Sequence, residues 1–123
     1  MVSVLFDTNI LIDYLNRIDA ATHELRSSDA PKISVITWME IMVGADPAKE
    51  AAIREWLKSF EVLPLTPAVS EMAVALRRER GRGLKLPDAI IWATARVHGA
   101  ILSTRNTKDF PPDEPNVRIP YTL

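Results

Sequence analysis

The chain has 123 residues, of which 47% are hydrophobic and 25% are charged, and its formal net charge is -1 at pH 7. This is the profile of one domain with one core, so we expect residues 1–123 to fold as a single domain. The absence of cysteine excludes disulfides and thiolate metal sites, and neither a secretory signal nor an apolar run long enough for a membrane span is visible, so we expect a cytoplasmic protein.

Short apolar runs alternate with segments of helical periodicity along the chain. The pattern predicts a strand over residues 2–6, a helix that starts near Thr8 or Asn9, and a helical turn or two within residues 19–28. The remaining expected strands lie over residues 33–36, 61–65, 100–103 and 117–119. The remaining expected helices run from an N-cap at Thr37 to Gly44, over residues 47–60, and from Pro87 to Gly99. A further helix begins at Thr66 and Pro67 and is broken at Gly81 and Gly83. This alternation predicts an α/β fold, a three-layer α/β/α sandwich around a central parallel sheet.

Asp7 follows the first predicted strand directly. In an open parallel sheet, ligands bind beyond the carboxyl ends of the strands, and no lysine or arginine lies nearby in sequence. This placement favours a cation ligand. The alternative is that Asp7 only caps the helix that follows.

Two further acids have similar predicted positions. Glu40 and Asp88 are each expected in the first turn of a helix, and their helices adjoin strands. Several carboxylates at one sheet edge repel one another unless Mg²⁺ or Mn²⁺, which prefer oxygen ligands, neutralises them. The alternatives are a capping box formed by Thr37 and Glu40, and a favourable interaction of Asp88 with its helix dipole.

The polar segment over residues 103–110 follows the penultimate predicted strand and therefore belongs to the same edge of the sheet. It offers hydroxyl, amide and carboxylate groups. The alternative is an asparagine-containing turn, with Asp109 as the cap of a short helical turn.

Charge is distributed unevenly along the chain. Residues 1–75 carry 6 basic and 11 acidic side chains, a net of -5, whereas residues 76–109 carry 8 and 3, a net of +5. The basic segment suggests contact with a polyanion, although a solvated helix face gives the same pattern. The residues predicted to hold the backbone of such a polyanion are Arg77, Arg78, Arg80, Arg82, Lys85, Arg105 and Lys108.

Three segments of the chain together resemble the PIN domain family and, within it, the VapC-type toxins of bacterial toxin–antitoxin systems. These segments are LFDTNILIDYL, ISVITWMEI and KLPDAIIWATARVHGAILSTRNTKDF. The resemblance covers nearly the whole chain. It implies Mg²⁺- or Mn²⁺-dependent cleavage of RNA, neutralisation by a cognate VapB-type antitoxin, and a homodimer. The alternative is a non-catalytic RNA- or protein-binding module on a decayed PIN fold.

The resemblance also implies roles for particular residues. Asp7, Glu40 and Asp88 match the three acids of the family's metal site, and Thr8 and Thr104 match hydroxyl positions that line it. The chain departs from the fuller pattern at the fourth acid. Asn106 stands at that place, and Asp109 lies three residues further on.

The helices expected after the first two strands carry more apolar residues than one core-facing stripe needs. The surplus comes from Ile10, Leu11, Ile12, Tyr14 and Leu15, and from Trp38, Met39, Ile41, Met42 and Val43. We interpret part of this surplus as a surface covered by the antitoxin or a second copy; a thickly buried helix pair is the alternative.

Overall fold

The computed structural model describes residues 2–123 and contains a five-stranded sheet, in which all neighbouring strands pair in parallel. The strand order is β3-β2-β1-β4-β5. The strands are short: β1 (Val4–Phe6), β2 (Lys32–Ser34), β3 (Glu61–Leu63), β4 (Ile101–Ser103) and β5 (Val117–Arg118).

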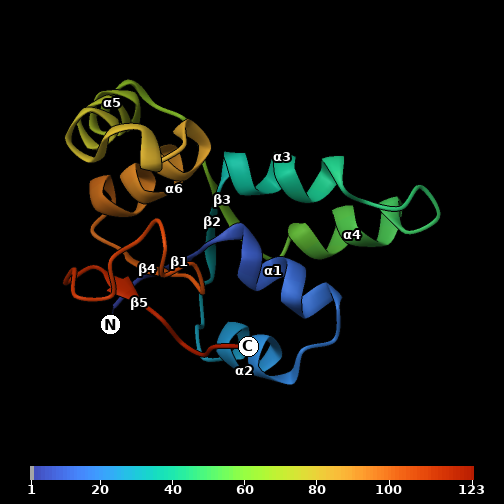
Figure 1. Cartoon of the computed structure of the whole chain (residues 1–123). Coiled ribbons are helices and arrows are strands. Elements are labelled where there is room, and N and C mark those ends of the chain that lie inside the picture. The colour runs from blue at the N-terminus through green and yellow to red at the C-terminus, as the bar shows by residue number, and fades with distance from the viewer. Residues whose placement is uncertain (1) are drawn as a thin grey trace.

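Helices cover both faces of this sheet (Figure 1). They are α1 (Thr8–Leu15), α2 (Asp19–Arg26), α3 (Val35–Val43), α4 (Glu50–Leu57), α5 (Pro67–Arg80) and α6 (Leu86–Val97), with a 3₁₀ turn, η1 (Gly81–Gly83), between the last two. Successive residues of β1 serve opposite faces: Leu5 packs with the buried residues of α5 and α6, and Phe6 packs with those of α1, α3 and α4. The predicted three-layer α/β/α sandwich is therefore confirmed.

The strand order places a topological switch point at the centre of the sheet. From β1 the chain proceeds through β2 to β3 on one side, and then returns to β4 and β5 on the other. The register pairs Phe6 with Ser103, so Asp7 and Thr104 leave the sheet side by side. Ligands of open α/β sheets bind at this kind of position.

The boundary between β2 and α3 differs from the prediction. The strand ends at Ser34, and α3 already begins at Val35, because the Ser34 side chain accepts a 3.1 Å hydrogen bond from the amide of Ile36 and caps the helix. Thr37 is therefore a buried residue inside the helix, and its predicted role as N-cap was wrong. The alternative of a capping box formed by Thr37 and Glu40 is therefore wrong as well, and Glu40 lies beyond the first turn of α3.

Other boundaries shift by a few residues. The helix predicted over 47–60 is shorter, since α4 spans Glu50–Leu57 and the segment before it forms a turn in which Asp46 accepts a hydrogen bond from the amide of Ala48. The start of α5 is as predicted, with Thr66 accepting a 3.2 Å hydrogen bond from the amide of Val69. Within residues 2–123, no helix is long and apolar enough to cross a membrane.

Candidate active site

Asp7 is a buried carboxylate at the end of β1. Its Oδ1 accepts a 2.7 Å hydrogen bond from the amide of Thr8, so Asp7 caps α1, as the alternative interpretation of this residue expected. Its Oδ2 accepts a 2.7 Å bond from the hydroxyl of Thr104. Burial raises the pKa of Asp7 to about 6, with smaller contributions from the nearby charges of Asp88 and Glu40, while the two hydrogen bonds oppose the shift.

Glu40 reaches the same edge of the sheet from α3. Its Oε1 accepts a 2.7 Å hydrogen bond from the hydroxyl of Thr8. The Thr8 oxygen also lies 2.9 Å from the hydroxyl oxygen of Thr37. Because Thr8 has one hydroxyl proton and gives it to Glu40, Thr37 is the donor of the second bond. A chain of two hydroxyl groups therefore orients an otherwise exposed carboxylate.

Asp88 and Asp109 complete a group of four acids. Asp88 lies in the first turn of α6, as predicted, and its pKa is raised by burial and then by the charges of Asp109 and Glu40, whereas Lys85 lowers it. In both Asp7 and Asp88, the charges of neighbouring acids add to the effect of burial and raise the pKa further. Asp7, Glu40, Asp88 and Asp109 thus share one negative region, although the end of a strand, two helices and a loop supply them.

The loop after β4 is held by Asn106. Its Oδ1 accepts 3.2 Å hydrogen bonds from the amides of Lys108 and Asp109, and its Nδ2 donates a 2.8 Å bond to Asp109 Oδ2. The asparagine turn is therefore present. The capping residue is Asn106 rather than Asp109, because the amide oxygen of Asn106 faces the free backbone amides.

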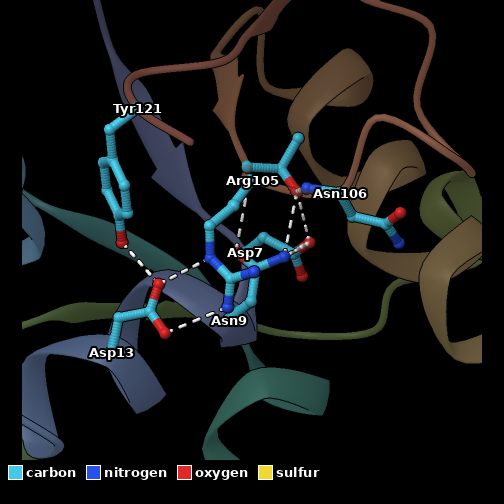
Figure 2. A network of polar contacts seen from close by, with 7 residues as sticks. Asp7, Asn9, Asp13, Arg105, Asn106 and Tyr121 are labelled. Carbon is cyan, nitrogen blue, oxygen red and sulfur yellow. Dashed lines mark hydrogen bonds and ion pairs between the residues drawn. The ribbon is translucent and has the colours of Figure 1, made fainter. Parts of the chain in front are cut away.

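Asn9 and Asp13 are polar residues of this region that the sequence interpretation did not select. They are separated by one helical turn on α1 and face the loop after β4. Asn9 contacts Asp7 and Thr104, and Asp13 pairs with Arg105 (Figure 2). The spacing of two polar residues four apart in an otherwise apolar helix was the signal available in the sequence.

Comparison with known proteins identifies the fold family. A model of the PIN domain matches residues 4–111. The chain belongs to the PIN domain family. It is 30% identical over 120 residues to the tRNA(fMet)-specific endonuclease VapC of Shigella flexneri, a match that covers 89% of this chain and 91% of that protein.

Solved structures agree with this assignment. A toxin–antitoxin complex from Klebsiella pneumoniae superposes with a TM-score of 0.91 at 46% identity, covering 98% of this chain and 100% of that one. The DNA-bound VapBC of Salmonella typhimurium has a TM-score of 0.78 at 23% identity and covers 99% and 98% of the two chains. The chain is thus a PIN domain of the VapC type.

Nucleases of this family generally depend on a divalent metal, and the acids of this chain fit one by charge. Within residues 2–123, no lysine or arginine forms an ion pair with Asp7, Glu40, Asp88 or Asp109. In the same residues, no three acids or histidines lie close enough to ligate one ion together. Mg²⁺ is nevertheless commonly held by one or two carboxylates with several waters, so the set is compatible with it.

The predicted RNA-binding residues fall into two groups. Three of the side chains have partners within the chain: Arg77 donates to the carbonyl of Gly81, Arg80 pairs with Glu114, and Arg105 pairs with Asp13. The other four, which are exposed, are Arg78, Arg82, Lys85 and Lys108.

Proposed function

We propose that the chain is a Mg²⁺- or Mn²⁺-dependent endoribonuclease, the toxin of a VapC-type pair, formed by one PIN domain over residues 1–123. The observation that carries this proposal is the convergence of Asp7, Glu40, Asp88 and Asp109 at the switch point of the sheet, where no lysine or arginine of residues 2–123 forms an ion pair with them. A negative site of this kind repels an RNA phosphate, so a bound cation is needed to bring the two together.

We assign the metal to Asp7, Glu40 and Asp88, with one or two of these carboxylates bound to the ion directly and the rest through its water molecules. When bound, the ion would lower the pKa of a water molecule and offset negative charge on the scissile phosphate. The surrounding side chains orient the ligands: Thr104 fixes Asp7, Thr8 fixes Glu40, and both hydroxyl groups donate to carboxylates at 2.7 Å. Asn106 holds Asp109 next to Asp88, where its carboxylate adds negative charge without joining the three ligands.

We propose that the exposed cations Arg78, Arg82, Lys85 and Lys108 hold the RNA backbone. Phosphate contacts of this type position a strand without reading its sequence. Single-stranded or looped RNA is the expected substrate, because its bases are accessible outside the deep groove of an A-form helix. Transfer RNA is the first substrate to test, since the relative from Shigella flexneri cleaves the initiator tRNA.

We further propose that a VapB-type antitoxin neutralises the chain in the cytoplasm. A groove of about 630 Å³ lies between α1 and the α3–α4 pair, and its walls include Ile12, Leu15, Ile53 and Trp56 together with Glu40 of the acid group. An apolar segment seated in this groove would reach the active site. The complex from Klebsiella pneumoniae supports this assignment.

A homodimer is the expected assembly. Support comes from apolar side chains that are exposed outside the groove, such as Val74 and Leu86, which are 43% and 52% exposed. Sedimentation of the isolated chain as a stable monomer at micromolar concentration would contradict the dimer.

The test of the enzymatic function uses Asp7→Asn. Purified protein is incubated with initiator tRNA and with a single-stranded RNA oligonucleotide, in Mn²⁺ or in EDTA. We expect cleavage by the wild type in Mn²⁺ only, and none by Asp7→Asn, whose circular dichroism spectrum stays native. Undiminished cleavage by the variant would refute the assignment.

A non-catalytic binding module on a decayed PIN fold is the second candidate. The separation of the acids, of which no three within residues 2–123 are close enough to share an ion, favours it. Calorimetry with Mn²⁺ discriminates between the two. A nuclease binds the ion at micromolar to millimolar concentration and loses that binding in Asp7→Asn, whereas a decayed site binds none.

A further inference from the structure

Asp13 is a buried acid next to the acid group, and its partners are basic and phenolic. It lies on α1 with its side chain 6% exposed. The guanidinium of Arg105 binds Asp13 in a bidentate ion pair, with Nε 2.7 Å from Oδ2 and Nη2 3.0 Å from Oδ1. The hydroxyl of Tyr121, from the C-terminal segment, donates a further 2.7 Å bond to Oδ2 (Figure 2).

The same arginine is linked to the acid group through its backbone. The amide of Arg105 donates a 3.2 Å hydrogen bond to Asn9 Oδ1. Asn9 in turn donates 3.3 Å bonds from Nδ2 to Asp7 Oδ2 and to the hydroxyl oxygen of Thr104. The amide of Asn106 donates to that hydroxyl oxygen at 3.0 Å. The side chain of Asn9 and the amide of Asn106 therefore both hold the Thr104 hydroxyl in position.

The positions of Asn9 and Asp13 on α1 explain how this helix holds Arg105. Asn9 and Asp13 lie four residues apart on α1, so they form two attachment points on one helix face. The first receives the backbone of Arg105 and the second receives its side chain. A bidentate ion pair with a buried carboxylate is among the strongest polar contacts available, and it fixes orientation as well as distance.

We propose that Asp13 and Arg105 form a positioning pair that clamps the loop after β4 onto α1 and thereby holds the Thr104 hydroxyl against Asp7. The inference rests on the proposed nuclease function and deepens it. It gives Arg105 a role other than the phosphate contact expected from the sequence. Tyr121 extends the clamp to the C-terminal segment.

The test is a double-mutant cycle with Asp13→Asn, Arg105→Gln and the double variant, measured as kcat and KM on initiator tRNA in Mn²⁺. Loss of an outer partner of a ligand costs about 10- to 100-fold in activity. We expect each single variant to lower kcat by at least tenfold with KM within twofold. We expect the double variant to be no worse than either, because both remove the same contact. Arg105→Lys, which keeps one bond, should recover part of kcat.

Arg118→Gln is the matched control. It also removes an arginine from a buried carboxylate, Glu24, to which Arg118 lies at 2.7 Å, but it has no bond to Asp7 or Asn9. We expect a lower melting temperature with unchanged kcat. A kcat loss in Arg118→Gln equal to that in Arg105→Gln would show a general effect of stability and overturn the proposal.

Hydrogen exchange gives a readout that needs no RNA and no metal. The amides of Arg105 and Asn106 donate to side chains of the site, so Asp13→Asn should speed their exchange by at least tenfold relative to the amides of β1. An inactive wild type with this acceleration would refute the nuclease function and support the clamp. Unchanged exchange, or a raised KM in Arg105→Gln with normal kcat in Asp13→Asn, would overturn the clamp and return Arg105 to RNA binding.

Discussion

The hydroxyl of Thr104 donates a 2.7 Å hydrogen bond to Oδ2 of Asp7, although 97 residues separate the two in sequence. Both residues directly follow neighbouring parallel strands, β1 and β4, whose register brings their carboxyl ends together. The bond lowers the pKa of Asp7, while burial raises it more strongly. Thr104 therefore stabilises the ionised carboxylate, which is the form that a cation needs.

Replacing Thr104 with valine tests this relationship. The variant keeps the branched shape and removes the donor, so Asp7 loses a charge-assisted bond in a buried place. We expect kcat to fall about tenfold at pH 7.5, as is common for an outer partner of a metal ligand. Thr104→Ser keeps the hydroxyl and serves as control. Full activity of Thr104→Val would show that this bond is dispensable.

The raised pKa of Asp7 predicts how the stability of the metal-free protein depends on pH. The folded pKa of about 6 lies above the ordinary value of 3.8, so the folded state binds the proton more tightly than the unfolded chain does. This contribution is complete below pH 3.8 and is lost as the pH rises through 6. The shift corresponds to about 3 kcal/mol.

The measurement compares wild type with Asp7→Asn by urea unfolding in EDTA between pH 4 and pH 8. The wild type should lose stability relative to the variant over this range, since asparagine is neutral at every pH. A constant difference between the two would mean that Asp7 is not the titrating group.

Metal binding should offset part of that loss. At pH 7.5, an ion that binds only the folded protein stabilises it by about 1.4 kcal/mol at ten times its Kd. We expect Mn²⁺ to raise the melting temperature of the wild type and to leave that of Asp7→Asn unchanged. Glu71→Gln, a loss of an exposed acid on α5, is the control and should respond like the wild type. An equal response of Asp7→Asn would place the ion elsewhere.

The order of elements and the layers were predictable from the sequence, since apolar residues mark the strands, and Asp7 and Thr66 cap the helices that follow them. The segment ISVI was the exception. Four residues of this composition fit a strand or the start of a helix equally well. The choice depends on Ser34, whose hydroxyl accepts a hydrogen bond from the amide of Ile36, so the strand ends two residues earlier than predicted.

The acids of the site were predictable as separate residues, because Asp7 and Asp88 have recognisable positions at helix starts. The residues that hold the neighbouring loop in place were not predictable. Asp13 and Arg105 are 92 residues apart, and Asp13 and Tyr121 are 108 apart. Such contacts depend on the packing of α1 against the loop after β4, and neither periodicity nor capping rules encode it.

RNA binding should respond to the exposed cations near the end of α5. Each phosphate contact contributes about 0.7 to the slope of log K against log salt for a single strand. Arg78→Gln, Arg82→Gln and Lys85→Gln together should therefore lower the slope by about 2 and raise KM at fixed salt. Lys58→Gln, which removes an exposed lysine outside this segment, should leave the slope unchanged. An unaltered slope in the triple variant would place the RNA on another surface.

Thr37 is the residue whose assigned role changed most, from a helix cap to a buried donor, and that role predicts a graded effect. Its hydroxyl donates to Thr8, which donates to Glu40. Thr8→Val removes the direct bond to the carboxylate and should lower kcat by about tenfold. Thr37→Val leaves that bond in place but frees Thr8 to turn away, so a smaller loss of kcat is expected, together with a lower melting temperature from the buried oxygen left without its donor.

Thr37→Ser should behave like the wild type in cleavage assays. If Thr37→Val lost more activity than Thr8→Val, the order of donors in this chain would be wrong.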